Sequence, residues 1–292
     1  MKMSVAIDQR AILGESLLWN AATATWWWTD IDAHFIYCRT SGGEAVQSFA
    51  MPDKVGSFVF CTSGKMLLGL AKQLAWFDTQ TGAVTPFLDV ETELASTRIN
   101  DGRTDRAGNY VFGTIDQQLP RQPIASFYQY SSAHGLRRLD LPKVAIANSL
   151  CFSLDGRTLY FTDTPSRRIM QCDYDAQTAQ VSEPRLFVET EAHAFPDGSV
   201  VDSAGCVWNA QWGAAQIVQY APDGCVLQRI AVPVKNPTCP AFGGAELDYL
   251  MVTSSRKDMS ADELAQMPQA GSLFELSMTS TRGVADARFK DN

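Results

Sequence analysis

Short runs of alternating apolar and polar residues recur along nearly the whole chain, and glycine, aspartate, asparagine and proline separate them. Alternation with a period of two is typical of β-strands with one buried face, and the separating residues favour turns. The pattern therefore predicts an all-β protein. The strands are expected in pairs, an apolar and usually aromatic strand followed by a second apolar strand, within residues 26–37, 66–78, 110–130, 159–172, 207–220 and 249–276.

The six pairs begin roughly 40 to 50 residues apart, which is the length of one four-stranded propeller blade. Six such blades use up the 292 residues. The sequence therefore predicts a six-bladed β-propeller that forms a single domain over residues 1–292. Residues 5–7 are expected to form a strand against the last blade, and residues 260–267 carry a capping-box pattern that predicts a short helix.

A two-sheet sandwich, or a pair of β domains, is the alternative architecture. Two domains are normally joined by a linker of distinct composition. No such shift in composition occurs along this chain, so the single propeller is the preferred prediction.

Composition narrows the class of protein. Hydrophobic residues make up 46% of the chain and charged residues 19%, values typical of a compact globular protein. The net charge is −8 and the lysines and arginines are scattered, which argues against nucleic-acid or anionic-membrane partners. No apolar run approaches membrane-spanning length, and the N-terminus lacks the pattern of a secretory signal.

The cysteines bear on the compartment. The chain has seven of them, an odd number, without CxxC spacing, and most lie in apolar strand-like runs. Such cysteines are typically reduced and buried, because disulfide frameworks belong to oxidising compartments. The sequence therefore predicts a cytoplasmic protein. We expect it to be either a monomer or a small homo-oligomer.

Four polar residues occupy one phase of the repeat. Each precedes an apolar strand by about ten or eleven positions, and equivalent positions of a cyclic repeat converge in space. Three of the four lie eight residues before a glycine expected in a turn, at Gly108, Gly156 and Gly205. The four are Glu15, Asn100, Asn148 and Asp197. Their spacing predicts a ring of oxygen ligands.

Carboxylates and amide carbonyls make a hard, oxygen-only environment that suits Ca²⁺, Mg²⁺ or Mn²⁺, and that Zn²⁺ can also occupy. In the second and sixth blades the same phase holds Gly56 and falls near Cys239, neither of which offers a hard oxygen ligand. Asp-Gly and Asn-Asp-Gly are also ordinary turn sequences, so any one of them alone favours a turn. The shared phase of all four favours a common site.

The chain resembles the SMP-30/gluconolactonase family, which includes regucalcin and the sugar-lactone lactonases, along almost its full length. The resemblance rests on ordered motifs at blade spacing. They are Leu13-Gly14-Glu15-Ser16, Arg98-Ile99-Asn100-Asp101-Gly102, Asn148-Ser149-Leu150, Phe195-Pro196-Asp197-Gly198-Ser199, Phe242-Gly243-Gly244 and Thr253-Ser254-Ser255-Arg256.

The resemblance implies a propeller that hydrolyses an aldonolactone, such as L-arabinonolactone or gluconolactone, with one divalent cation: Ca²⁺, Zn²⁺, Mn²⁺ or Mg²⁺. It implies metal ligation by Glu15, Asn148 and Asp197, with Asp197 also the general base. It implies substrate contacts from Arg98 and Asn100.

Gln118 is the main departure from the family pattern, because a glutamate that contacts substrate is usual near this position. Gln118 would exchange an anionic contact for a neutral one, which is expected to change substrate preference. Residues 117–125 around it are expected to form a lid that tunes specificity.

Two other classes of function remain open. A Ca²⁺-binding or scaffold propeller without activity is possible, because a fold does not fix a function. A paraoxonase-type esterase would prefer apolar substrates, whereas Arg98 and Asn100 suit a polyol. No GxSxG motif supports a serine hydrolase.

Overall fold

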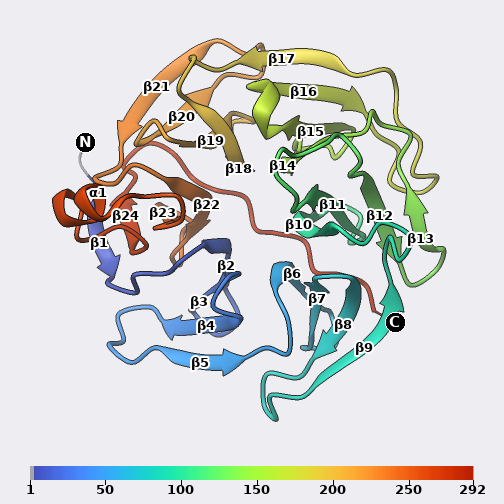
Figure 1. The fold of residues 1–292 in the computed structure, drawn as a ribbon, viewed down its shortest axis with the longest axis horizontal. Coiled ribbons are helices and arrows are strands. Elements are labelled where there is room, and N and C mark those ends of the chain that lie inside the picture. Colours follow the sequence, from blue (N-terminus) through green and yellow to red (C-terminus); the bar gives the residue numbers. More distant parts are fainter. Residues whose placement is uncertain (1–2, 292) are drawn as a thin grey trace. The chain divides into compact units, whose positions relative to one another are not determined.

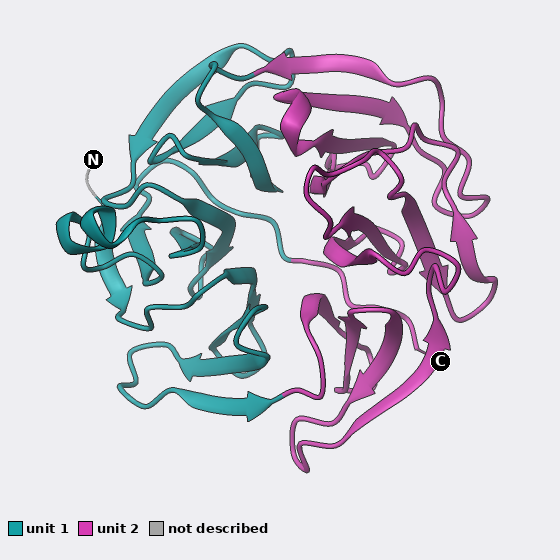
Figure 2. Ribbon diagram, in the orientation of Figure 1, with its two compact units in different colours: residues 1–50, 190–285 teal, residues 51–189, 286–292 magenta. Residues whose placement is uncertain are grey.

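The computed structural model describes residues 3–291, and nearly all of their regular structure is β-strand (Figure 1). Six four-stranded antiparallel sheets follow one another along the chain. They are the blades of a six-bladed β-propeller, so the predicted fold class is confirmed. The contacts between residues divide the chain into two compact units, which Figure 2 colours separately. The expected single domain over residues 1–292 stays a prediction.

Unit 1 comprises residues 1–50 and 190–285 and holds three of the sheets. Within it, β22 packs beside both β2 and β18. The strands of the first sheet are β2 (Gly14–Asn20), β3 (Thr25–Asp30), β4 (Phe35–Thr40) and β5 (Gln47–Ala50). Those of the second are β18 (Phe195–Val201), β19 (Val207–Trp212), β20 (Gln216–Tyr220) and β21 (Val226–Ala231). Those of the third are β22 (Pro237–Gly243), β23 (Tyr249–Ser254), β24 (Leu273–Ser277) and β1 (Ser4–Ile7).

Unit 2 comprises residues 51–189 and 286–292 and holds the other three sheets. Within it, β10 packs beside both β6 and β14. The strands of its first sheet are β6 (Val55–Phe60), β7 (Met66–Leu70), β8 (Gln73–Phe77) and β9 (Val84–Asp89). Those of the second are β10 (Thr97–Thr104), β11 (Tyr110–Asp116), β12 (Phe127–Ser131) and β13 (Gly135–Arg138). Those of the third are β14 (Ala147–Phe152), β15 (Thr158–Asp163), β16 (Arg168–Asp173) and β17 (Arg185–Glu189).

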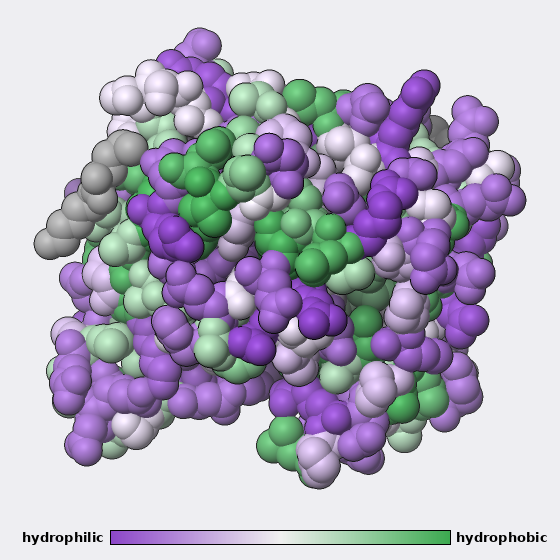
Figure 3. Space-filling view, turned by 90° about the horizontal axis from the view of Figure 1, so that it is seen from above, coloured by the Kyte–Doolittle hydropathy of each residue, from purple (hydrophilic) through white to green (hydrophobic). Residues whose placement is uncertain are grey.

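Apolar side chains from neighbouring sheets pack against one another inside each unit. In unit 1, Trp208, Phe242 and Phe274 share one buried cluster, and in unit 2, Phe127 packs edge-on against Phe161. This burial is the main free energy that holds the sheets together. On the face that Figure 3 shows, hydrophobic residues form small groups among hydrophilic ones, as is ordinary for a protein surface.

Two local predictions are confirmed. β1 pairs with β24, so the N-terminal strand completes the last sheet. The predicted helix is α1 (Ala261–Gln266), and Ser260 and Glu263 form the reciprocal hydrogen bonds of a capping box. No helix among residues 3–291 is long and apolar enough to cross a membrane.

Strands β2, β6, β10, β14, β18 and β22 each begin a sheet, and each pairs irregularly with the strand that follows it. The pairing register shifts at one point in each pair, which marks a β-bulge. The shifts fall between Glu15 and Leu18, Val55 and Ser57, Ile99 and Gly102, Asn148 and Cys151, Pro196 and Ser199, and Pro237 and Pro240.

Candidate metal and substrate site

The four polar residues singled out in the sequence all lie at these bulges. Glu15 and Asn148 are the last paired residues before the register shifts, opposite Thr29 and Thr162. Asn100 and Asp197 lie inside the shifts. The phase predicted from the sequence is therefore a backbone feature that every sheet repeats. Asn100-Asp101-Gly102 and Asp197-Gly198 lie within strands, so the alternative interpretation of these two sequences as turns is wrong.

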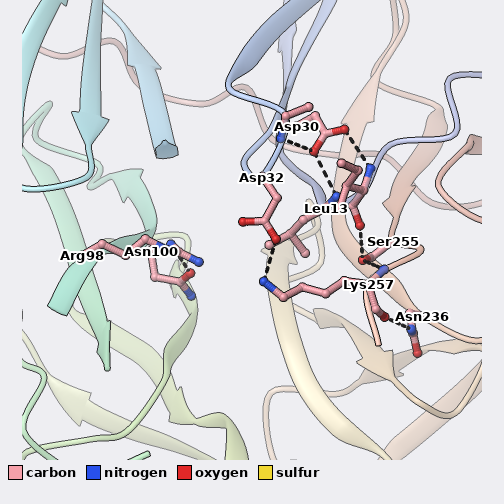
Figure 4. Close-up of polar contacts among 10 residues, drawn as sticks. Leu13, Asp30, Asp32, Arg98, Asn100, Asn236, Ser255 and Lys257 are labelled. Atoms are coloured by element: carbon pink, nitrogen blue, oxygen red, sulfur yellow. Dashed lines mark hydrogen bonds and ion pairs between the residues drawn. The ribbon is translucent and has the colours of Figure 1, made fainter. Parts of the chain in front are cut away.

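In unit 2, three predicted residues form one chain of buried hydrogen bonds. The guanidinium of Arg98 donates through Nη1 to Asn100 Oδ1 at 2.8 Å, and Figure 4 shows these two side chains together. Asn100 Nδ2 donates to Asn148 Oδ1 at 2.9 Å. Asn148 Nδ2 in turn donates to Thr164 Oγ1 at 2.9 Å. The direction of each amide is set by its partners, so the network is pre-organised.

These hydrogen bonds make Asn148 and Asn100 unequal in their suitability for binding a cation. Asn148 Oδ1 accepts a hydrogen bond from a neutral amide and retains a second lone pair. Asn100 Oδ1 accepts from a guanidinium, so a cation bound there would meet a positive charge at close range. The chemistry of the donors therefore suits Asn148 to a metal and Asn100 with Arg98 to a polar or anionic substrate group.

Asp101 links the bulges of β10 and β14. Its Oδ2 accepts a hydrogen bond from the backbone N–H of Leu150 at 2.9 Å, which joins β10 to β14. Burial raises the pKa of Asp101, although this hydrogen bond opposes the rise. Asp101 thus holds Asn100 and Asn148 in register across neighbouring sheets.

The two predicted carboxylate ligands lie in unit 1. Glu15 is half-buried, and its Oε2 accepts a hydrogen bond from the N–H of Ser16, whose φ of 51° lies in the left-handed region. Asp197 is buried in β18. Asn209, on the neighbouring β19, donates through Nδ2 to the carbonyl oxygens of Asp197 at 3.2 Å and Gly198 at 3.3 Å. The bulge that carries Asp197 is therefore braced from inside its own sheet.

Thr164 and Asn209 are the supporting residues that the sequence reasoning missed. Thr164 lies in the short turn after β15, and no local pattern marks it as a partner of Asn148. Asn209 offers a usable signal, because it directly follows the apolar residues Val207 and Trp208 in a predicted strand. Its amide is fully buried and must therefore find hydrogen-bond partners.

Gln118 does not join the buried network of unit 2. It is exposed, on the loop of residues 117–124 between β11 and β12. Asp116 anchors this loop, because its carboxylate accepts the N–H groups of Gln118 at 3.1 Å and Gln122 at 2.9 Å. Burial tends to raise the pKa of Asp116, but hydrogen bonds from Gln122, Ser96 and Gln118 together hold it below its usual value. The lid and the substrate role of Gln118 stay predictions.

Cysteine and histidine add no alternative metal centre in the described part of the chain. Among residues 3–291, no group of three or more His, Cys, Asp and Glu side chains is placed to hold a metal. Glu15, Asn148 and Asp197 stay the predicted metal ligands. All seven cysteines are free and six are buried, as expected from their apolar surroundings.

The comparisons with known proteins agree with the fold and the motifs. The family model described as SMP-30/Gluconolactonase/LRE-like region matches residues 13–256. The chain is 41% identical to L-arabinolactonase of Azospirillum brasilense, over 97% of this chain and 93% of that protein. It is 30% identical to 6-deoxy-6-sulfogluconolactonase of Pseudomonas putida, over 93% of each. The solved structure of regucalcin from Agrobacterium tumefaciens, described as a calcium-binding protein, matches with a TM-score of 0.92 at 30% identity, over 99% of this chain and 98% of that chain.

Six four-stranded blades define a β-propeller, and four of its bulges carry the polar residues Glu15, Asn100, Asn148 and Asp197. The chain belongs to the SMP-30/gluconolactonase family, since the family model covers well over half of its length. The predicted family resemblance is confirmed.

Proposed function

We propose that this protein hydrolyses a sugar lactone to the corresponding aldonic acid, in sugar catabolism, with the help of one divalent metal ion. The observation that carries the proposal is the buried hydrogen-bonded series from Arg98 through Asn100 to Asn148, which places the two proposed substrate-binding side chains beside the amide oxygen of a proposed metal ligand. The similarity to an L-arabinolactonase and a 6-deoxy-6-sulfogluconolactonase supports the same reaction class.

The proposed metal ligands are Glu15, Asn148 and Asp197. Two carboxylates balance the charge of a divalent cation, and the amide oxygen adds a neutral hard donor. Ca²⁺, Zn²⁺, Mn²⁺ and Mg²⁺ all accept such ligands, and the similarity to a calcium-binding regucalcin favours including Ca²⁺ first. When bound, the cation supplies Lewis acidity at the lactone carbonyl.

Asp197 is proposed as the general base. It takes a proton from the attacking water as the water oxygen bonds to the lactone carbonyl carbon. The bond from that carbon to the ring oxygen then breaks, and Asp197 returns the proton to the ring oxygen. The bracing of its bulge by Asn209 keeps the carboxylate in place through both transfers.

Arg98 and Asn100 are proposed to bind the sugar hydroxyl groups. Arg98 carries a permanent positive charge into a buried position, which stabilises negative charge that develops on the substrate. Gln118 is proposed to add a neutral contact from the lid. A pentonolactone such as L-arabinonolactone and a hexonolactone such as gluconolactone both fit this donor set.

The compartment and assembly complete the proposal. The seven free cysteines favour a reducing environment, and we place the protein in the cytoplasm. It is proposed to act as a monomer or a small homo-oligomer on a small-molecule substrate, without nucleic-acid or membrane partners.

The test is a hydrolysis screen over 1,4- and 1,5-aldonolactones. The protein is first stripped with a chelator and then assayed with Ca²⁺, Zn²⁺, Mn²⁺ or Mg²⁺. We expect turnover of at least one lactone that is lost on chelation and restored by one of these metals. Metal binding with no turnover of any lactone would favour a calcium-binding protein without activity. Preferential cleavage of apolar aryl esters would favour the paraoxonase-type alternative.

A further inference from the structure

An ion pair outside the proposed ligand set lies at the end of unit 1 from which β2 and β22 begin. Lys257 follows β23, and its Nζ donates to Asp32 Oδ2 at 2.6 Å (Figure 4). Asp32 follows β3, the strand that pairs with β2. The two residues are 225 positions apart in the chain, so the pair is a product of the tertiary fold.

The backbone around Lys257 is fixed to the segments that enter two first strands. The N–H of Lys257 donates to the carbonyl of Ile12 at 3.0 Å, and Ser255 Oγ donates to the same carbonyl at 2.8 Å. Asn236 Nδ2 donates to the carbonyl of Lys257 at 3.2 Å. Ile12 lies just before β2 and Asn236 just before β22. Lys257 is therefore held at the end of β2 where Glu15 lies.

The turn that contains Asp32 is also fixed to the segment that enters β2. Asp30, two residues earlier, accepts the N–H of Ile12 at 2.8 Å through Oδ2 and the N–H of Leu13 at 3.0 Å through Oδ1 (Figure 4). Its Oδ1 also accepts the N–H of Ala33, which closes the turn that contains Asp32. Both members of the ion pair thus stand on a rigid backbone next to the entry of β2.

The pair remains accessible to a solute. The side chain of Lys257 is 32% exposed and that of Asp32 is 16% exposed. An ammonium has three donor hydrogens, so the hydrogen bond to Asp32 leaves Lys257 able to donate to a further ligand. Next to them Asn236, which is 1% exposed, has a side-chain oxygen that accepts no hydrogen bond among residues 3–291, whereas buried amide oxygens normally find a donor.

We propose that Lys257, oriented by Asp32, is a substrate-binding residue that donates to the hydroxyl groups of the aldonolactone and to the carboxylate of the aldonate product. The inference rests on the proposed function and adds a charged recognition group next to β2, the strand that carries Glu15. An ammonium carries a positive charge and three donor hydrogens, so Lys257 can donate to a sugar hydroxyl and to the carboxylate of the product while it stays bound to Asp32.

The experiment compares three variants of the full chain. Lys257→Met removes the charge while keeping a similar apolar stem, and Lys257→Arg keeps the charge. Lys235→Met is the matched control, because Lys235 is also a half-exposed lysine of unit 1, paired with Glu263 of helix α1. The measurements are kcat and KM for the best lactone of the screen, the Kd for L-arabinonate and D-gluconate by calorimetry, and thermal melting as a check of folding.

We expect Lys257→Met to raise KM and the aldonate Kd by about tenfold, as for the loss of a hydrogen bond to a charged group, with kcat changed less than twofold. Lys257→Arg should recover part of the loss, and Lys235→Met should behave as wild type. Wild-type KM and Kd in a folded Lys257→Met protein would overturn the inference alone.

The remaining outcomes separate the inference from the proposed function. If the wild type hydrolyses no lactone but binds an aldonate in a manner that depends on Lys257, the proposed function fails and the inference stands. If the wild type neither hydrolyses a lactone nor binds an aldonate, both are overturned. An equal loss in the Lys257→Met and Lys235→Met proteins would show a general charge effect and would also overturn the inference.

Discussion

Strands β6 and β14 of unit 2 each carry a bulge near the same phase of the repeat, and they differ in the residue found at that phase. At β14 the residue is Asn148, whose amide is held by Asn100 and Thr164. At β6 it is Gly56. A Cβ atom on Gly56 would lie 2.3 Å from the carbonyl oxygen of Ile99 and 2.6 Å from that of Asn100, far inside contact distance.

The difference teaches that the bulge is a property of the scaffold, whereas the space beside it decides which residue it can carry. At β6, the backbone of β10 fills that space, and glycine is the residue that permits the approach. This close approach brings no ligand of its own, but it packs β10, the strand that carries Arg98 and Asn100. The side chain of Asn148 and the lack of one at Gly56 thus both help to position Arg98 and Asn100 on β10.

The largest expected effect comes from the bulge in β18. We expect Asp197→Ala to lower kcat for a lactone by about a thousandfold or more, because it removes the proposed base and a metal ligand together. Steady-state kinetics with saturating metal measures the loss. Asp223→Ala, in an exposed turn of the same unit, is the control and should retain wild-type kinetics. Activity of Asp197→Ala within tenfold of wild type would rule out its assigned role.

A stability measurement tests the claim about space at β6. We expect Gly56→Ala to lower the free energy of unfolding by about 3 kcal/mol, because the added methyl group overlaps the backbone of β10. The control is Gly82→Ala, where φ is 75° and no atom lies within 4 Å of the added Cβ, so only backbone strain of about 1 kcal/mol applies. Urea unfolding of both proteins gives the two values. Equal losses would mean that the approach of β10 does not restrict this position.

The smallest expected effect sharpens the description of β14. Thr164→Val removes the hydroxyl that holds the Asn148 amide while preserving the shape of the side chain. Loss of a partner that orients a metal ligand typically costs tenfold or more in metal affinity, and we expect about tenfold here. Calorimetric titration of the chelated protein measures it, and Thr164→Ser should recover most of the affinity. Unchanged affinity in Thr164→Val would show that Asn100 alone orients the amide, or that Asn148 is not a ligand.

Local patterns predicted much of this molecule. Alternating residues located the strands, and Gly108, Gly156 and Gly205 adopt positive φ angles of 89°, 71° and 81° at the expected turns. The phase of Glu15, Asn148 and Asp197 also follows from the sequence, because a repeat places equivalent residues at equivalent points of each sheet. The bulges themselves were not predicted, because a register shift depends on the pairing of two strands and leaves no periodic signal in either one.

The sequence by itself determined the fold class, the turn positions and the phase of the polar residues, since these depend on interactions between residues close in the chain. The tertiary structure decided which side chains meet. Asn100 and Asn148 lie in different sheets, and Lys257 and Asp32 lie in turns that follow strands of different sheets. The exposed position of Gln118 and the exclusion of a side chain at Gly56 likewise depend on the packing of distant segments. Such contacts carry no local signature, because the free energy that selects them comes from burial across the whole unit.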